Sequence, residues 1–142
     1  LLSSYKFEKY KGKSADESGM ASLQLLASNA SEKTKIAKLV EKVLTTVDSV
    51  FLCRDWSNEP PNTGTPEFYA KECEALAKKW GLKCKVYDEA ECKKEGMGLF
   101  LGVGAGSDRE GRMVVLEYTP KKAGKNTKTL ALVGKGITFD TG

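Results

Sequence analysis

The side chains best suited to chemistry stand near the carboxyl end of the sequence. Lys135 lies between Gly134 and Gly136, and Asp140 follows the lysine five positions later. Glycines permit close approach of the backbone to a bound group, and a lysine and a carboxylate at this spacing can converge on one point. An ordinary surface lysine and a turn aspartate would give the same pattern. Because a metal-binding lysine also needs burial beside a cation that favours the neutral amine, the spacing alone leaves the chemistry open.

The sequence contains no histidine. This excludes a Ser-His-Asp triad, a Cys-His pair and an H-E-x-x-H zinc site within these residues. The glycine-rich stretch from Gly102 to Gly106 has the wrong spacing for either phosphate-binding motif, G-x-x-x-x-G-K-[ST] or G-x-G-x-x-G. Any hydrolytic chemistry must therefore be carried by carboxylates, lysines and metal, and nucleotide binding is not indicated.

The composition describes an ordinary globular chain. Its 142 residues are 40% hydrophobic, which is enough for one domain with a core. Charged residues make up 30% and the net charge is +4, so the surface is mixed and does not indicate nucleic-acid binding. No apolar run approaches the roughly 20 residues that a membrane-spanning helix needs. We therefore expect neither nucleic acid nor membrane as a partner.

The cysteines indicate a reducing compartment. There are four of them, irregularly spaced and without a C-x-x-C pair, which disfavours a zinc knuckle or a thioredoxin-type motif. Reduced, largely buried thiols are typical of a cytosolic protein. We expect this state for all four, namely Cys53, Cys73, Cys84 and Cys92.

A long helix is the clearest structural element. Apolar residues recur at spacings of three and four from Ile36 to Phe51, and Asn29 or Ser31 can cap the start. The pattern predicts a helix of about 20 residues or more, which ends before Pro60 and Pro61. Such a helix could bridge two domains or lie on the core of its own domain, and the pattern leaves both alternatives open.

Two further helices are predicted after the long one, and the later of these begins with a capping box. Thr65, Pro66 and Glu67 give the start signals of a helix that reaches Trp80 and stops at Gly81. Residues 82–87 are a strand candidate. Asp88 and Glu91 resemble a capping box that opens a short helix, which Gly96 ends. The buried stripe of the second helix is predicted to be Ala70, Cys73, Leu76, Ala77 and Trp80.

The remaining apolar runs predict strands. Residues 99–103 and 113–118 are apolar enough to be covered on both faces, as in an α/β sheet. Residues 21–27 also predict a strand, and residues 1–13 a strand or an extended segment. Residues 129–134 predict a last buried strand that delivers Lys135 and Asp140 at its carboxyl end, which is where ligands collect in open α/β sheets. The lysine-rich residues 120–128 favour a solvated hairpin loop over an anion site.

Residues 132–142 (LVGKGITFDTG) resemble, almost residue for residue, the first metal-binding motif of the leucyl (cytosol) aminopeptidase family of the M17 type. Other blocks agree with that family in order and spacing. Residues 5–11 (YKFEKYK) are similar to the end of its amino-terminal domain, and residues 54–66 to its domain-linking segment. Residues 96–107 and 115–118 are similar to its early catalytic-domain strands. The resemblance covers nearly the whole chain.

The resemblance implies an α/β fold, with a mixed sheet flanked by helices, in which a long interdomain helix precedes the start of the catalytic domain. Residues 1–30 would close the amino-terminal domain, 31–53 would form the linker helix, and 54–142 the first part of the catalytic metallopeptidase domain. We expect an internal fragment of such a protein.

The resemblance also implies a reaction. In that family the residues matching Lys135 and Asp140 bind a pair of divalent metal ions, usually zinc, with manganese or magnesium able to substitute at one site. Two such ions can hold the free amino terminus and scissile carbonyl of a peptide and generate a hydroxide nucleophile. The implied reaction releases amino-terminal leucine or another large apolar residue. A cytoplasmic homo-hexamer is implied for the full-length form.

No catalytic residue is expected within the chain, because the catalytic lysine, the arginine and the remaining ligands of the family lie beyond the position of Gly142. The 142-residue polypeptide alone is therefore predicted to be inactive. One alternative is a non-catalytic, aminopeptidase-like scaffold that lacks the downstream ligands. Another is a complete small α/β binding domain that matches the motif by chance. The downstream ligand residues would discriminate the scaffold from the enzyme, and the several matching blocks in order disfavour a chance match.

Overall fold

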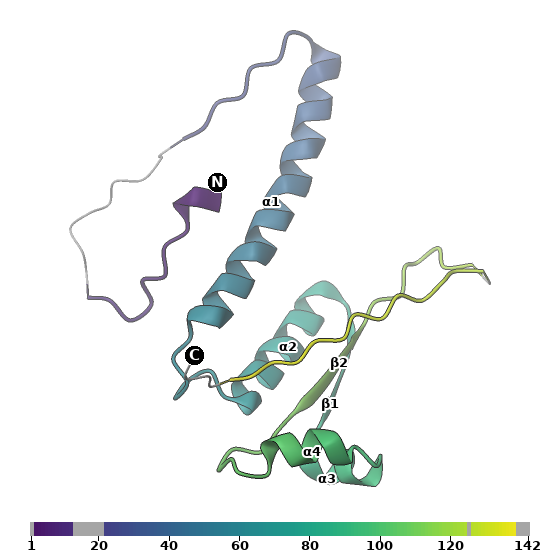
Figure 1. Ribbon diagram of the computed structural model, residues 1–142. Helices are drawn as coiled ribbons and strands as arrows, with labels where there is room; N and C mark the ends of the chain where they lie inside the picture. Colours follow the sequence, from purple (N-terminus) through teal and green to yellow (C-terminus); the bar gives the residue numbers. More distant parts are fainter. Residues whose placement is uncertain (1, 13–21, 125, 139–142) are drawn as a thin grey trace. The chain divides into compact units, whose positions relative to one another are not determined.

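The computed structural model describes residues 2–12, 22–124 and 126–138 (Figure 1). The chain divides into two compact units, Leu1–Glu59 and Pro60–Gly142. No helix within the described ranges is long and apolar enough to cross a membrane. In chain order the elements are η1 (Leu2–Ser4), α1 (Ala30–Asn58), α2 (Pro66–Trp80), β1 (Lys83–Tyr87), α3 (Glu89–Lys94), α4 (Gly98–Gly104) and β2 (Met113–Glu117).

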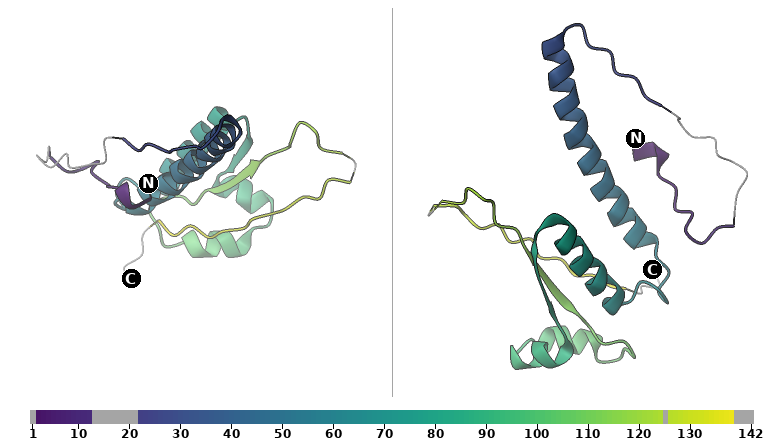
Figure 2. Two further views of the ribbon diagram at one scale, coloured as in Figure 1. Left: turned by 90° about the horizontal axis from the view of Figure 1, so that it is seen from above. Right: turned by 180° about the vertical axis from the view of Figure 1, so that it is seen from behind.

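The long helix α1 dominates the first unit and appears as one continuous helix in the right view of Figure 2. Its start is capped by Asn29, whose side chain accepts a hydrogen bond of 2.9 Å from the backbone N–H of Glu32. Its end is set by Pro60, which favours the extended backbone that Glu59 adopts (φ −64°, ψ 132°). The predicted helix is confirmed, and it continues beyond the predicted end at residue 53 to Asn58.

The strand predicted over residues 21–27 is wrong for the described residues 22–27, which form no regular element. Leu23, Leu25 and Leu26 are 60%, 55% and 90% exposed. A strand needs a neighbour for its backbone groups, and none pairs with this segment among the described residues. Between η1 and the turn at residues 9–10, the chain is irregular rather than a strand.

In the second unit, α2 packs against a two-stranded antiparallel sheet (Figure 1). The register pairs Lys83 with Glu117 and Tyr87 with Met113. The helix contributes the buried Ala70 and Ala77. The α/β class is confirmed, but β2 is not covered on both faces as predicted, because two strands and one packed helix leave Val115 and Leu116 each 41% exposed.

The start and stop of α2 agree with the sequence signals. The Thr65 hydroxyl accepts a hydrogen bond of 3.3 Å from the Phe68 N–H, and Gly81 adopts the left-handed conformation with φ 68°. The burial predicted for Trp80 is wrong, since this residue is 56% exposed. Trp80 is the last residue of α2, where a small sheet offers little surface to cover a large side chain.

The short helices show one confirmed and one wrong prediction. The capping box of α3 is present, with the Asp88 carboxylate accepting from the Glu91 N–H at 2.7 Å and the Glu91 carboxylate from the Asp88 N–H at 3.3 Å. The strand predicted over residues 99–103 is wrong, because these residues form α4, which packs against α3. A five-residue apolar run fits either element, since it is too short to show a period.

The segment after β2 contains no helix or strand over residues 119–124 and 126–138. The prediction of a buried strand over residues 129–134 is wrong for this structure. Leu130, Leu132 and Val133 are 82%, 89% and 96% exposed. The described sheet has only two strands, and neither pairs with this segment, so its backbone groups remain available to water.

All four cysteines are free thiols. Cys92 is fully buried, and Cys73 and Cys84 are partly buried. Cys53 is exposed, which corrects the expectation of burial for this residue, because it lies on a helix face of α1 that solvent reaches.

Candidate functional site

The candidate ligand Lys135 lies in the irregular segment that follows β2, and its side chain is exposed. The nearby Ile137 is 58% exposed, and Thr138 is half-buried at a bend. Asp140, the second candidate, lies outside the described residues. The convergence of Lys135 and Asp140 on one point therefore stays a prediction.

The described residues do not form a metal site by themselves. Within these ranges no group of three or more histidine, cysteine, aspartate or glutamate side chains could hold a metal ion. A lysine binds a metal only as the neutral amine, which burial beside a cation favours. Since Lys135 is exposed, it lacks these surroundings. A pair of divalent ions would need ligands from elsewhere in addition to this lysine.

The thiols of the second unit are poor candidates for a nucleophile. Burial is the main cause that raises the pKa of Cys73, Cys84 and Cys92 above the ordinary value, and nearby carboxylates raise it further. The reactive form of cysteine is the thiolate. These three groups are therefore held in the less reactive thiol form, as expected for structural cysteines.

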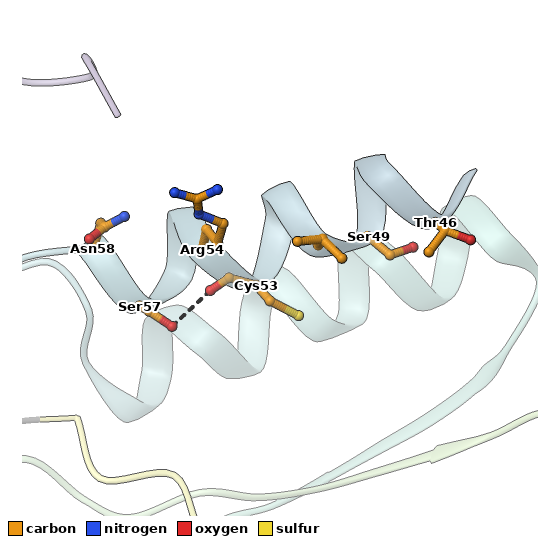
Figure 3. A pocket seen from close by; sticks show the side chains of 7 residues that line it. Thr46, Ser49, Cys53, Arg54, Ser57 and Asn58 are labelled. Atoms are coloured by element: carbon orange, nitrogen blue, oxygen red, sulfur yellow. Dashed lines mark hydrogen bonds between the residues drawn. The ribbon is translucent and has the colours of Figure 1, made fainter. Parts of the chain in front are cut away.

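An open groove of about 530 Å³ runs along one face of α1 (Figure 3). It lies apart in sequence from Lys135 and is lined by no carboxylate. The Ser57 hydroxyl donates a hydrogen bond of 2.8 Å to the carbonyl of Cys53, so this polar group is already used by the helix itself. We assign the groove no chemistry. Its lining is Thr46, Ser49, Val50, Cys53, Arg54, Ser57 and Asn58.

The side-chain network of the first unit was missed by sequence reasoning. The hydroxyl of Tyr5 donates to the Asp55 carboxylate at 2.7 Å, and Lys9 lies 2.5 Å from the Glu59 carboxylate. The partners are about 50 positions apart in the chain. No periodicity connects residues at such a separation, and only paired changes across many related sequences would have signalled these contacts.

Two comparisons with known proteins agree on a family. Residues 51–142 match the model of "Cytosol aminopeptidase family, catalytic domain", a range that includes both Lys135 and Asp140. The chain is 42% identical over 144 residues to the cytosol aminopeptidase of Rickettsia prowazekii (strain Madrid E). It is 41% identical over the same length to the probable cytosol aminopeptidase of Rickettsia canadensis (strain McKiel).

The chain is also similar in structure to a solved protein. The bottromycin maturation enzyme BotP in complex with Mn superposes with a TM-score of 0.67 at 29% identity, over 84% of this chain and 24% of that one. A second structure of BotP gives a TM-score of 0.64 at 28% identity, over 83% of this chain and 24% of that one. This chain spans 28% of the length of the curated relatives named above. From the match over residues 51–142, the chain belongs to the cytosol aminopeptidase family.

Proposed function

We propose that this chain is the part of a metal-dependent aminopeptidase that carries the first metal-binding motif. Family membership over residues 51–142 is the observation that carries the proposal. The chain spans 28% of its relatives' length, so the activity is proposed for a longer polypeptide that includes these residues. The proposed reaction is hydrolytic release of the amino-terminal residue of a peptide.

Within this proposal, Lys135 and Asp140 are two ligands of a pair of divalent metal ions. Zinc is the proposed metal, with manganese or magnesium as substitutes, and the complex of BotP with Mn is consistent with a divalent ion in this fold. The other ligands are proposed to come from outside these 142 residues, and within the described ranges no group of three or more histidine, cysteine, aspartate or glutamate side chains could hold a metal ion. The absence of histidine is compatible with a site built from carboxylates and amines.

The preferred substrates are proposed to be peptides with a free amino terminus and leucine or another large apolar residue in first position. The proposed assembly is a homo-hexamer in the cytoplasm, and a cytoplasmic location is consistent with the cytosol aminopeptidases among the relatives. A scaffold that keeps the assembly without catalysis is the second candidate. The intact motif residues Lys135 and Asp140 favour the enzyme over the scaffold.

A chimera tests the proposal directly. The aligned 28% of the Rickettsia prowazekii relative is replaced by this chain, and hydrolysis of leucine para-nitroanilide is measured with added Zn²⁺ or Mn²⁺. We expect metal-dependent activity in the chimera. We expect Lys135→Ala and Asp140→Asn to lower kcat/KM by at least about 100-fold, since each removes a group proposed to hold the metal.

The matched control for the lysine is Lys128→Ala, which removes another lysine from the same irregular segment and should leave kcat/KM unchanged. The bound metal per chain is measured by elemental analysis in the same samples. A folded chimera in which Lys135→Ala retains both full metal content and full activity would contradict the proposed role of this lysine.

A further inference from the structure

The carboxyl-terminal end of α1 lacks the usual features that stabilise a helix end. Its last turn contains no basic residue, while Asp55 and Glu59 place carboxylates where the helix dipole is negative. No glycine closes the helix, and the N–H of Glu59 lies 3.4 Å from the carbonyl of Trp56, a long hydrogen bond. Taken alone, these residues predict a frayed end.

Residues 2–12, which we call the amino-terminal strap, supply the missing partners. The Tyr5 hydroxyl donates to Asp55 at 2.7 Å and accepts from the amide of Asn58 at 3.1 Å. The ammonium of Lys9 and the hydroxyl of Tyr10 each lie 2.5 Å from one of the two carboxylate oxygens of Glu59. Both carboxylates at this helix end therefore receive hydrogen bonds from the strap.

The aromatic ring of Tyr5 adds apolar and cation–π contacts. Its centroid lies 5.1 Å from that of Phe51 and 3.9 Å from the guanidinium carbon of Arg54. The guanidinium of Arg54 in turn donates to the carbonyl of Leu2 at 3.3 Å. Contacts of the strap thus reach from Phe51 to Glu59, which is the last two turns of α1 and the residue after them.

The burial of Glu59 makes the strap more than a surface ion pair. The Glu59 side chain is only 4% exposed, although Lys9 is 50% exposed. Desolvation of Glu59 raises its pKa, but the hydrogen bonds from Lys9 and Tyr10 and the charge of Lys9 outweigh this, and the net pKa lies below the ordinary value. Keeping a nearly buried carboxylate in place without these partners would cost free energy, because its charge would be unpaired.

We propose that the strap is a conformational clamp, which keeps residues 51–59 helical when it is docked and lets them fray when it is released. Those residues are the first that match the family's catalytic domain, whereas the strap lies before that match. The helical structure of residues 51–59, at the start of the matched catalytic domain, thus depends on the strap, which lies outside the match.

Amide hydrogen exchange in the full chain tests the clamp. In Tyr5→Ala and Glu59→Gln, we expect exchange of the amides of residues 54–59 to accelerate at least about tenfold. Tyr5→Phe keeps the ring contacts and loses the hydroxyl, so its effect should be smaller than that of Tyr5→Ala. Amides in α2 and β1 should keep the protection of the unmodified chain, because the proposed clamp acts on residues 51–59.

Two control variants match the chemistry of the changes. Tyr118→Ala removes a tyrosine that is 71% exposed, and Glu41→Gln neutralises an exposed carboxylate elsewhere on α1. Both should leave exchange at residues 54–59 unchanged. Unaltered protection of residues 54–59 in both Tyr5→Ala and Glu59→Gln would overturn the proposal. An equal loss of protection in α2 and β1 would overturn it as well, since the strap would then act on overall stability.

Discussion

Two stretches of the second unit for which the sequence predicts helices or strands differ in the structure. Residues 66–117 form α2, β1, α3, α4 and β2, and their core contains Ala77 at 3% exposure and Cys92 at 0%. Residues 129–134, which carry the strand pattern before Lys135, form no element and leave Val133 96% exposed. The first stretch finds its partners within the chain, whereas the second finds none among the described residues.

This difference shows which sequence signals are sufficient on their own. Caps and glycine stops act over three or four residues, so Thr65, Gly81 and Asp88 define their helices wherever the rest of the chain lies. A buried strand instead depends on two neighbours and on covering helices. The candidate ligand Lys135 follows residues 129–134, which were predicted to be such a strand and form none in this structure.

The largest difference between the two stretches is expected in how a side-chain substitution changes the free energy of unfolding. Ala77→Leu should lower the free energy of unfolding by about 1 to 3 kcal/mol, because the added atoms have no room between α2 and the sheet. Leu132→Ala, a change at a position 89% exposed, should alter it by less than about 0.5 kcal/mol. Urea denaturation followed by circular dichroism measures both. Equal effects of the two changes would remove the distinction between the stretches.

A smaller effect is expected from backbone conformation alone. Gly81 has φ 68°, and a Cβ added there would meet no atom within 4 Å. Gly81→Ala should therefore lower the free energy of unfolding by about 1 to 2 kcal/mol through the left-handed conformation only. The matched control is Gly134→Ala, which also meets no atom within 4 Å and has no positive φ. The midpoint temperature of thermal unfolding should be lowered by the first change and not by the second.

The smallest expected effect concerns the ion pair across β1 and β2, between Lys83 and Glu117 at 3.0 Å. A hydrogen bond from Lys83 is the main cause that lowers the pKa of Glu117 below its ordinary value of 4.5. A lowered carboxyl pKa stabilises the fold above the pKa of the unfolded chain, and the contribution is lost as the pH falls through the folded value. The urea midpoints of the original chain and Glu117→Gln should therefore differ at neutral pH and converge well below pH 4.5. A difference that persists at low pH would point to another cause.

Much of the fold could be predicted from local signals. The caps of α1, α2 and α3, the stops at Gly81 and Gly96, and the two paired strands agree with the sequence. The prediction for residues 99–103 is wrong because a short apolar run has no measurable period. The contacts of Tyr5 with Asp55 could not be foreseen, since side-chain pairs so far apart in the chain leave no pattern in one sequence.

The sequence predicts the candidate site as a motif, but it does not predict where the side chains of that motif lie. The glycines around Lys135 and the spacing to Asp140 resemble the family's metal-binding motif, and both residues lie within the matched range. We expect their arrangement to need partner strands, which the two-stranded sheet of the described residues does not supply. Metal binding requires burial of the lysine amine, and the segment alone leaves Lys135 exposed.

The most direct measurement is amide hydrogen exchange at residues 130–133, compared between this chain alone and the chimera with the Rickettsia prowazekii relative. In the chain alone, we expect these amides to exchange at the rate of an unstructured peptide, because Leu130, Leu132 and Val133 are exposed and unpaired with any described strand. In the chimera, we expect at least about 100-fold protection, as for the core strands of a folded domain. Full protection in the chain alone, or none in a chimera that hydrolyses leucine para-nitroanilide, would contradict the view that Lys135 is positioned by partner strands.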